Sequence, residues 1–125
     1  MAYPEYQNIE LYQGENFEMT VDFSGDSSYS MLGSSNTPKV YKAFLVDEYS
    51  TASASRTAIT VSDINTGEKT LKLSMAQDLT QALADDFDGY WDIMEKDVDE
   101  TPDKFTRLLQ GEAKVFPQIT LDDDF

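Results

Sequence analysis

Carboxylates are the side chains of this sequence that could do chemistry. The 125-residue chain has 24 Asp and Glu against nine Lys and Arg, no His, no Cys and a net charge of −15. A thiolate nucleophile, a Cys/His zinc site and every catalytic arrangement built on His are therefore excluded. The chemistry that remains is binding of divalent cations, or paired acid–base catalysis of the kind that hydrolyses glycosides.

The acidic spacings fit a calcium loop only in part. Asp97-x-Asp99-x-x-x-Asp103 supplies positions 1, 3 and 7, but Pro102 stands where the loop needs Gly and Leu108 where it needs a bidentate Glu. The Asp-Phe-Asp-Gly segment at 86–89 is shorter still, and the Asp run at 122–124 is typical of a solvated tail. We expect solvated turn carboxylates here, with no metal or cofactor.

Catalysis finds no better support in the motifs. No carboxylate pair stands out from a generally acidic chain, and the sequence contains no Walker motif, G-x-G-x-x-G or G-x-S-x-G. The negative charge argues against binding to nucleic acid or to anionic membranes. No apolar run reaches the ~20 residues of a membrane span, and we expect no secretory signal because the first residues lack a basic segment followed by an apolar one. We therefore expect a non-enzymatic protein that is synthesised in the cytoplasm.

Alternating apolar residues predict the elements that must position these side chains. Strands are expected near 9–11, 17–23, 40–46, 57–61, 71–73, 90–95 and 105–115, with a turn at 65–68. A loop that is either functional or mobile is expected at 24–38, and a shorter loop at 49–55. Ser74 is expected to cap a helix of about ten residues with Met75, Leu79 and Leu83 on one face.

This pattern predicts an all-β fold. Short strands with polar turns favour a single antiparallel, Ig-like β-sandwich with one short crossover helix, and a small closed barrel is the alternative. We expect an N-terminal arm at 1–7, the sandwich at 8–120 and an acidic tail at 121–125. Trp91 is expected to fill the core and Tyr90 to be mostly buried, while Gly111 is expected to mark a bulge or bend.

Several motifs together resemble a known family. Gly89-Tyr90-Trp91-Asp92-Ile93, then Arg107-Leu108-Leu109-Gln110-Gly111, then Ala113 to Thr120 (AKVFPQIT) occur in this order. Earlier in the chain come 9–17 (IELYQGENF) and 66–74 (TGEKTLKLS). Order and spacing are similar to those of small β-sandwich domains in tailed-bacteriophage virion proteins. The resemblance covers most of the chain outside 24–38.

The resemblance implies a structural role in the virion. Such a protein would be a non-catalytic adaptor in tail, baseplate or tail-fibre attachment, or else a capsid decoration protein, with other virion proteins as partners in a multi-copy symmetric assembly. The apolar residues Phe116, Ile119, Leu121 and Phe125 are candidates for docking on a neighbouring subunit. A carbohydrate- or calcium-binding module, with ligands at 85–89 or 97–103, is a further alternative.

Overall fold

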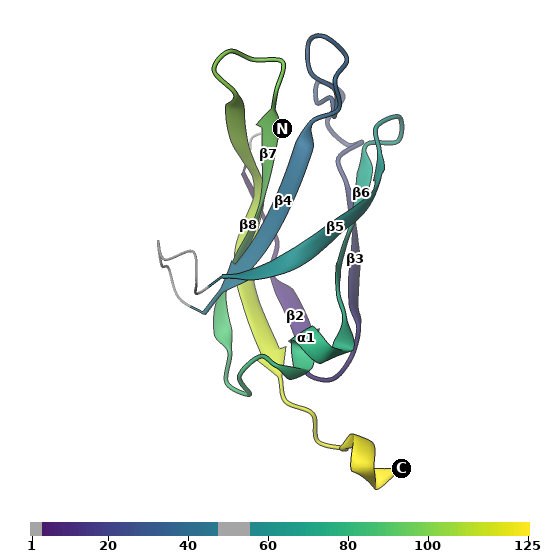
Figure 1. The fold of residues 1–125 in the computed structure, drawn as a ribbon, viewed down its shortest axis with the longest axis vertical. Coiled ribbons are helices and arrows are strands. Elements are labelled where there is room, and N and C mark those ends of the chain that lie inside the picture. Colours follow the sequence, from purple (N-terminus) through teal and green to yellow (C-terminus); the bar gives the residue numbers. More distant parts are fainter. Residues whose placement is uncertain (1–3, 48–55) are drawn as a thin grey trace.

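The chain folds into a curled sheet of eight strands that forms two facing layers (Figure 1). The computed structural model describes residues 4–47 and 56–125. The first layer contains β1 (Glu5–Tyr6), β2 (Ile9–Tyr12), β8 (Lys104–Phe116), β7 (Asp88–Asp97), β4 (Val40–Val46) and the start of β5 (Thr57–Asn65). The second contains the rest of β5, β6 (Thr70–Met75) and β3 (Phe17–Asp22). The expected all-β class is confirmed.

β5 connects the two layers. Its first residues pair with β4, and from Thr60 onward it pairs with β6. Figure 1 shows β5 crossing diagonally between the layers. The predicted turn at 65–68 joins β5 to β6, and the Asn65 Oδ1 atom accepts a hydrogen bond from the Glu68 backbone N–H at 3.0 Å. A single sheet bent in this way encloses a core without closing into a barrel.

The expectation of purely antiparallel pairing is wrong at one edge. β1 and β2 both run parallel to β8, in two registers separated by Gln7 and Asn8. Residues 5 and 6 of the expected N-terminal arm at 1–7 therefore form a strand of the sheet. Residues 1–3 lie outside the described part of the chain. The physical reason is that the unpaired edge of β8 offers backbone donors and acceptors, which these two short strands satisfy.

Inward positions of the strands form one apolar cluster between the layers. Trp91 is 2% exposed, as the expected core position requires, and Leu11, Leu73 and Ile93 are fully buried. Alternation along each strand places these side chains on the inner face and polar residues on the outer face. Burial of each such side chain stabilises the fold by about 1.5–3 kcal/mol relative to exposure.

Residues 24–38 form a loop as predicted, but this loop is part of the core. Tyr29 and Met31 are buried, and a bridge joins Leu32 to Pro38. The Tyr29 hydroxyl donates a hydrogen bond to the buried carboxylate of Glu95, which also pairs with Lys39 Nζ at 3.2 Å. Lack of periodicity in the sequence therefore reflects irregular backbone that is fixed by side-chain packing.

The helix is shorter than predicted. α1 spans Gln77–Gln81, and Ser74 belongs to β6 instead of capping the helix. The Gln77 N–H donates to Asn16 Oδ1 at 2.9 Å, so a residue from the β2–β3 turn satisfies the helix start. Met75 and Leu83 pack against the core as expected, but Leu79 is exposed and Thr80 is buried in its place. No helix in the described ranges is long and apolar enough to cross a membrane.

Gly111 has a different role from the one predicted. It pairs in register with Trp91, and the β7–β8 irregularity falls instead between Ile93 and Met94. A Cβ atom at Gly111 would lie 2.1 Å from the carbonyl oxygen of Gln7. Glycine is therefore needed because the segment between β1 and β2 passes directly against β8.

Candidate binding groove on the outer face of the first layer

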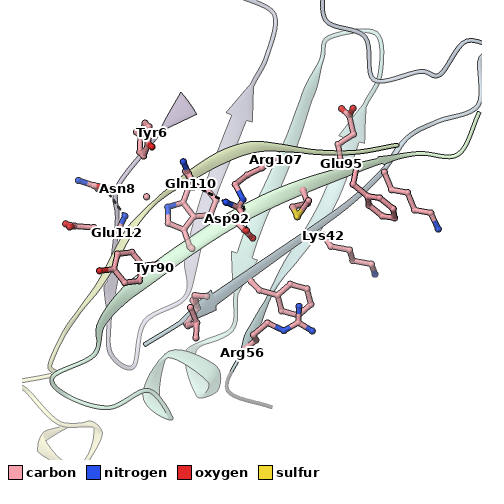
Figure 2. Close-up of a pocket in the computed structure, with 18 of the residues that line it drawn as sticks. Tyr6, Asn8, Lys42, Arg56, Tyr90, Asp92, Glu95, Arg107, Gln110 and Glu112 are labelled. Atoms are coloured by element: carbon pink, nitrogen blue, oxygen red, sulfur yellow. Dashed lines mark hydrogen bonds and ion pairs between the residues drawn. The ribbon is translucent and has the colours of Figure 1, made fainter. Parts of the chain in front are cut away.

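A groove of about 960 Å³ lies on the outer face of β4, β7 and β8 (Figure 2). Strand alternation sends Trp91 and Ile93 inward and Tyr90, Asp92 and Met94 outward, so the outward residues of three neighbouring strands share this face. The described residues that line it, here called the outer groove, are Tyr6, Asn8, Val40, Lys42, Phe44, Leu45, Val46, Arg56, Tyr90, Trp91, Asp92, Met94, Glu95, Lys96, Phe105, Arg107, Gln110, Gly111 and Glu112.

An ion pair occupies the centre of the outer groove. Arg107 Nε lies 3.1 Å from Asp92 Oδ2, and an Arg107 guanidinium N–H donates to Gln110 Oε1 at 3.2 Å. Partial burial raises the pKa of Asp92, and the positive charges of Arg107 and Arg56 act against this increase. The pair therefore keeps a charged carboxylate in a partly desolvated position, where its charge is available to a bound polar group.

Further basic side chains surround this pair. The Arg56 guanidinium lies 4.1 Å from the ring centroid of Phe44, a cation–π contact. At one end of the outer groove, Lys96 Nζ lies 3.4 Å from Asp103 Oδ2. Lys42 is exposed and has no ion-pair partner among the residues that the structure describes. The lining thus has four of the nine basic residues of the chain but only three of its 24 acidic residues.

Apolar and aromatic side chains complete the outer groove. Tyr90, expected to be mostly buried, is half-buried and lies on the outer face, where Figure 2 shows it at one end beside Glu112. Phe105 is 61% exposed and Tyr6 is 79% exposed. Val40 and Met94 add aliphatic surface. A face that combines exposed rings with cations is suited to a ligand that has both apolar groups and negative charge.

The acidic segment at 97–103 borders the outer groove, because Asp103 pairs with Lys96 of the lining, whereas the segment at 85–89 does not line it. A hydrogen bond from the Thr37 side chain, with further bonds from the backbone N–H groups of Ser35 and Thr37 at 2.8 and 3.3 Å, lowers the pKa of Asp99. At the other end of the molecule Asp85 accepts from Gln13 at 2.7 Å. Within the described ranges no three acidic side chains are placed to share a metal ion. These carboxylates stabilise turns through hydrogen bonds and an ion pair.

The four candidate interface residues divide into two kinds. The ring of Phe116 stacks on Tyr12 with centroids 5.3 Å apart, so this side chain is engaged within the chain. Ile119, Leu121 and Phe125 are 92%, 52% and 101% exposed. They belong to residues 117–125, here called the tail, which leaves the body beyond β8 (Figure 1).

The comparisons with known proteins do not assign this chain to a family. No protein-family model matches the sequence. No curated protein matches it significantly. The function proposed below therefore depends on the geometry of the chain and on the motif resemblance.

Sequence reasoning missed the outer groove because its cations are widely separated in the chain. Lys42, Arg56, Lys96 and Arg107 come from different segments and are obscured by an overall charge of −15. The signal that could have found them is alternation: Lys42 lies between Tyr41 and Ala43, which were already predicted to belong to a mostly apolar strand. Sorting the predicted strands 40–46 and 90–95 into two faces would have placed Lys42 beside the outward Asp92 and Met94. Arg107 would have been assigned to the wrong face, because the irregularity in β8 reverses the alternation there.

Proposed function

We propose that this chain is a non-catalytic structural protein of a tailed-bacteriophage virion, a small adaptor in tail, baseplate or tail-fibre attachment. The motif resemblance supports the proposal, and the motif residues have physical roles in this fold. Trp91, Leu108 and Leu109 are buried, and a Cβ at Gly89 would lie 2.0 Å from the Val46 carbonyl oxygen. These motif residues therefore have packing roles in β7 and β8. They support a fold in common with the family more directly than a common position in the particle.

The observation that carries the proposal is an open face whose apolar side chains are not covered. Phe105, Tyr6 and Val40 are exposed on the outer groove, and Ile119 and Phe125 are exposed on the tail. Exposed apolar groups gathered in one concave area mark surfaces that bind partners. An adaptor needs two separate surfaces of this kind, one for each neighbour, and the groove and the tail meet this need.

A capsid decoration protein of the same fold is the alternative position in the virion. Neither the sequence features nor the geometry distinguishes the two roles, because each role requires a stable domain with exposed contact surfaces. The two differ in number: decoration places hundreds of copies on a capsid, whereas attachment to a tail, baseplate or fibre gives multiples of three or six up to a few dozen. Many equivalent copies would let weak individual contacts add through avidity.

Quantitative mass spectrometry of purified particles, with heads and tails separated on a gradient, tests this proposal. Enrichment in the tail fraction at a few dozen copies or fewer is the expected result. Hundreds of copies in the head fraction would replace the adaptor by the decoration protein. Absence from both fractions would overturn the structural role and leave a carbohydrate-binding module, for which an array of glycans is the next assay.

A further inference from the structure

We propose that the outer groove receives the tail, residues 117–125, of a second copy of this chain. The inference rests on the proposed function in one respect, that many copies are held together in a particle. The surface and the segment have opposite character. The lining has four cations against three carboxylates in a chain with a net charge of −15, whereas the tail has three consecutive Asp residues flanked by Leu121 and Phe125.

The tail has a defined shape before it binds. Asp122–Asp124 form one turn of 3-10 helix, and the Leu121 N–H donates to Asp124 Oδ2 at 2.7 Å while the Asp124 N–H donates to the Leu121 carbonyl at 2.9 Å. At its start the Gln118 N–H donates to Gln13 Oε1 at 3.2 Å. A preformed turn loses less conformational entropy on binding than a flexible peptide does.

The chemistry of the groove matches this turn in kind and in size. Lys42 has no ion-pair partner among the described residues, so it can pair with an Asp of the tail without breaking an existing interaction. The exposed ring of Phe105 offers an aromatic contact for Leu121 or Phe125. A groove of about 960 Å³ is at the upper limit of small-ligand pockets, which suits several residues of peptide.

The direction of the tail favours a second copy over the chain's own groove. β8 places Phe105, Arg107 and Gln110 on the groove before it ends at Phe116, and the tail continues beyond that end, away from the sheet (Figure 1). Groove and tail are two different surfaces, so the contact joins copies head to tail. It can close reciprocally in a dimer or continue around a ring.

Charge reversal tests the contact in the purified full chain. Sedimentation velocity over a range of protein concentrations is expected to show reversible self-association that weakens with salt. K42E in the groove and D122K/D123K in the tail should each weaken it at least about tenfold, and mixing the two variants should restore a mixed complex. D122K/D123K keeps Asp124, which holds the turn. K104E is the matched control, because Lys104 is an exposed β8 lysine outside the groove lining.

The tail variant separates specific docking from general repulsion. Each Asp-to-Lys change shifts the net charge by two, so D122K/D123K lowers its magnitude from −15 to −11. Reduced repulsion alone would strengthen association, whereas docking on a basic groove predicts the opposite. A monomeric wild type at every concentration, a K104E variant as weak as K42E, or no recovery on mixing would each overturn the inference. Circular dichroism melting confirms that the variants are folded.

Failure of the inference and failure of the proposed function give different results. A chain that occurs in particles but stays monomeric in solution keeps the virion role and refutes tail docking. A chain that self-associates with the predicted charge-swap pattern but is absent from particles keeps tail docking and refutes the virion role.

Discussion

Gly111→Ala is expected to unfold the β1–β2 edge of the protein. A methyl group at Gly111 would lie 2.1 Å from the Gln7 carbonyl oxygen, and Cβ atoms essentially never approach a heavy atom closer than 3.0 Å. The backbone at Gln7 must therefore move by at least about 0.9 Å. The Gly111 backbone is not in the left-handed region, so steric contact and not backbone strain is what the substitution tests.

The energetic cost follows from the hydrogen bonds that this movement breaks. The Trp91 indole N–H donates to the Gln7 carbonyl at 2.6 Å, and the Gln7 N–H donates to the Gln110 carbonyl at 2.9 Å. Asn8 Oδ1 accepts from the Glu112 N–H at 3.0 Å. At about 1 kcal/mol each, with more for a buried indole left unsatisfied, the total loss is about 3 kcal/mol of unfolding free energy.

Urea denaturation followed by fluorescence measures this loss directly, because Trp91 is the only tryptophan. The folded variant should also show a red-shifted emission and stronger quenching by acrylamide, since its indole loses its partner and gains contact with water. Gly67→Ala is the control: its Cβ would meet nothing closer than Asn65 Oδ1 at 3.5 Å, an ordinary contact. Equal stability of the two variants, with unchanged Trp91 emission, would refute the argument.

Three further outcomes are expected. Lys39→Met should cost about 3 kcal/mol because it leaves the buried Glu95 carboxylate without its cation, and the double variant with Glu95→Gln should cost less than the sum of the single changes in a urea-denaturation cycle. Burial, together with the Glu95 carboxylate, raises the pKa values of Tyr29 and Tyr41 above 10.0, so the folded state keeps their protons longer than the unfolded state does. The free energy of unfolding should therefore fall as the pH rises above 10, by up to about 1.4 kcal/mol per pH unit for each tyrosine, and Y29F/Y41F should flatten this slope in thermal melts. Truncation after Gln118 should change the free energy of unfolding by less than about 0.5 kcal/mol and abolish self-association in sedimentation velocity; unchanged association, or unchanged incorporation into particles, would contradict the role of the tail.

Sequence alone predicted most of the strands because they have a period-two apolar pattern or, at 40–46, a mostly apolar run with β-branched and aromatic residues. The ranges expected at 40–46 and 17–23 agree with β4 and β3 closely, and Trp91 is buried as expected. The strand expected at 9–11 agrees with β2, but β1 and the parallel pairing of both strands with β8 were not predicted, since a two-residue strand carries no periodicity. Their formation depends on β8, which lies about a hundred residues away in the sequence and offers an unpaired edge. The expected loop at 49–55 lies outside the described residues.

Helix and bulge were predicted less well because tertiary contacts decided them. Ser74 is a strong N-cap by residue type, yet it continues β6, and Asn16 from another turn satisfies the helix start. Glycine is a typical bulge residue, but at Gly111 the lack of a side chain accommodates the Gln7 backbone instead. The residue type at Ser74 and Gly111 indicates that the backbone has a particular role there. The segment that packs nearby in the folded chain determines what that role is.

The charge distribution is the feature that composition concealed most completely. A net charge of −15 suggests a uniformly acidic surface, but the outer groove gathers nearly half of the basic residues and only an eighth of the acidic ones. Uniform charge would make copies of this chain repel each other in every orientation. With cations on the outer groove and three Asp residues on the tail, repulsion is relieved in the one orientation that brings these surfaces together. The net charge keeps free copies apart in other orientations, and the separation of the groove cations from the tail carboxylates would therefore select the register of their assembly.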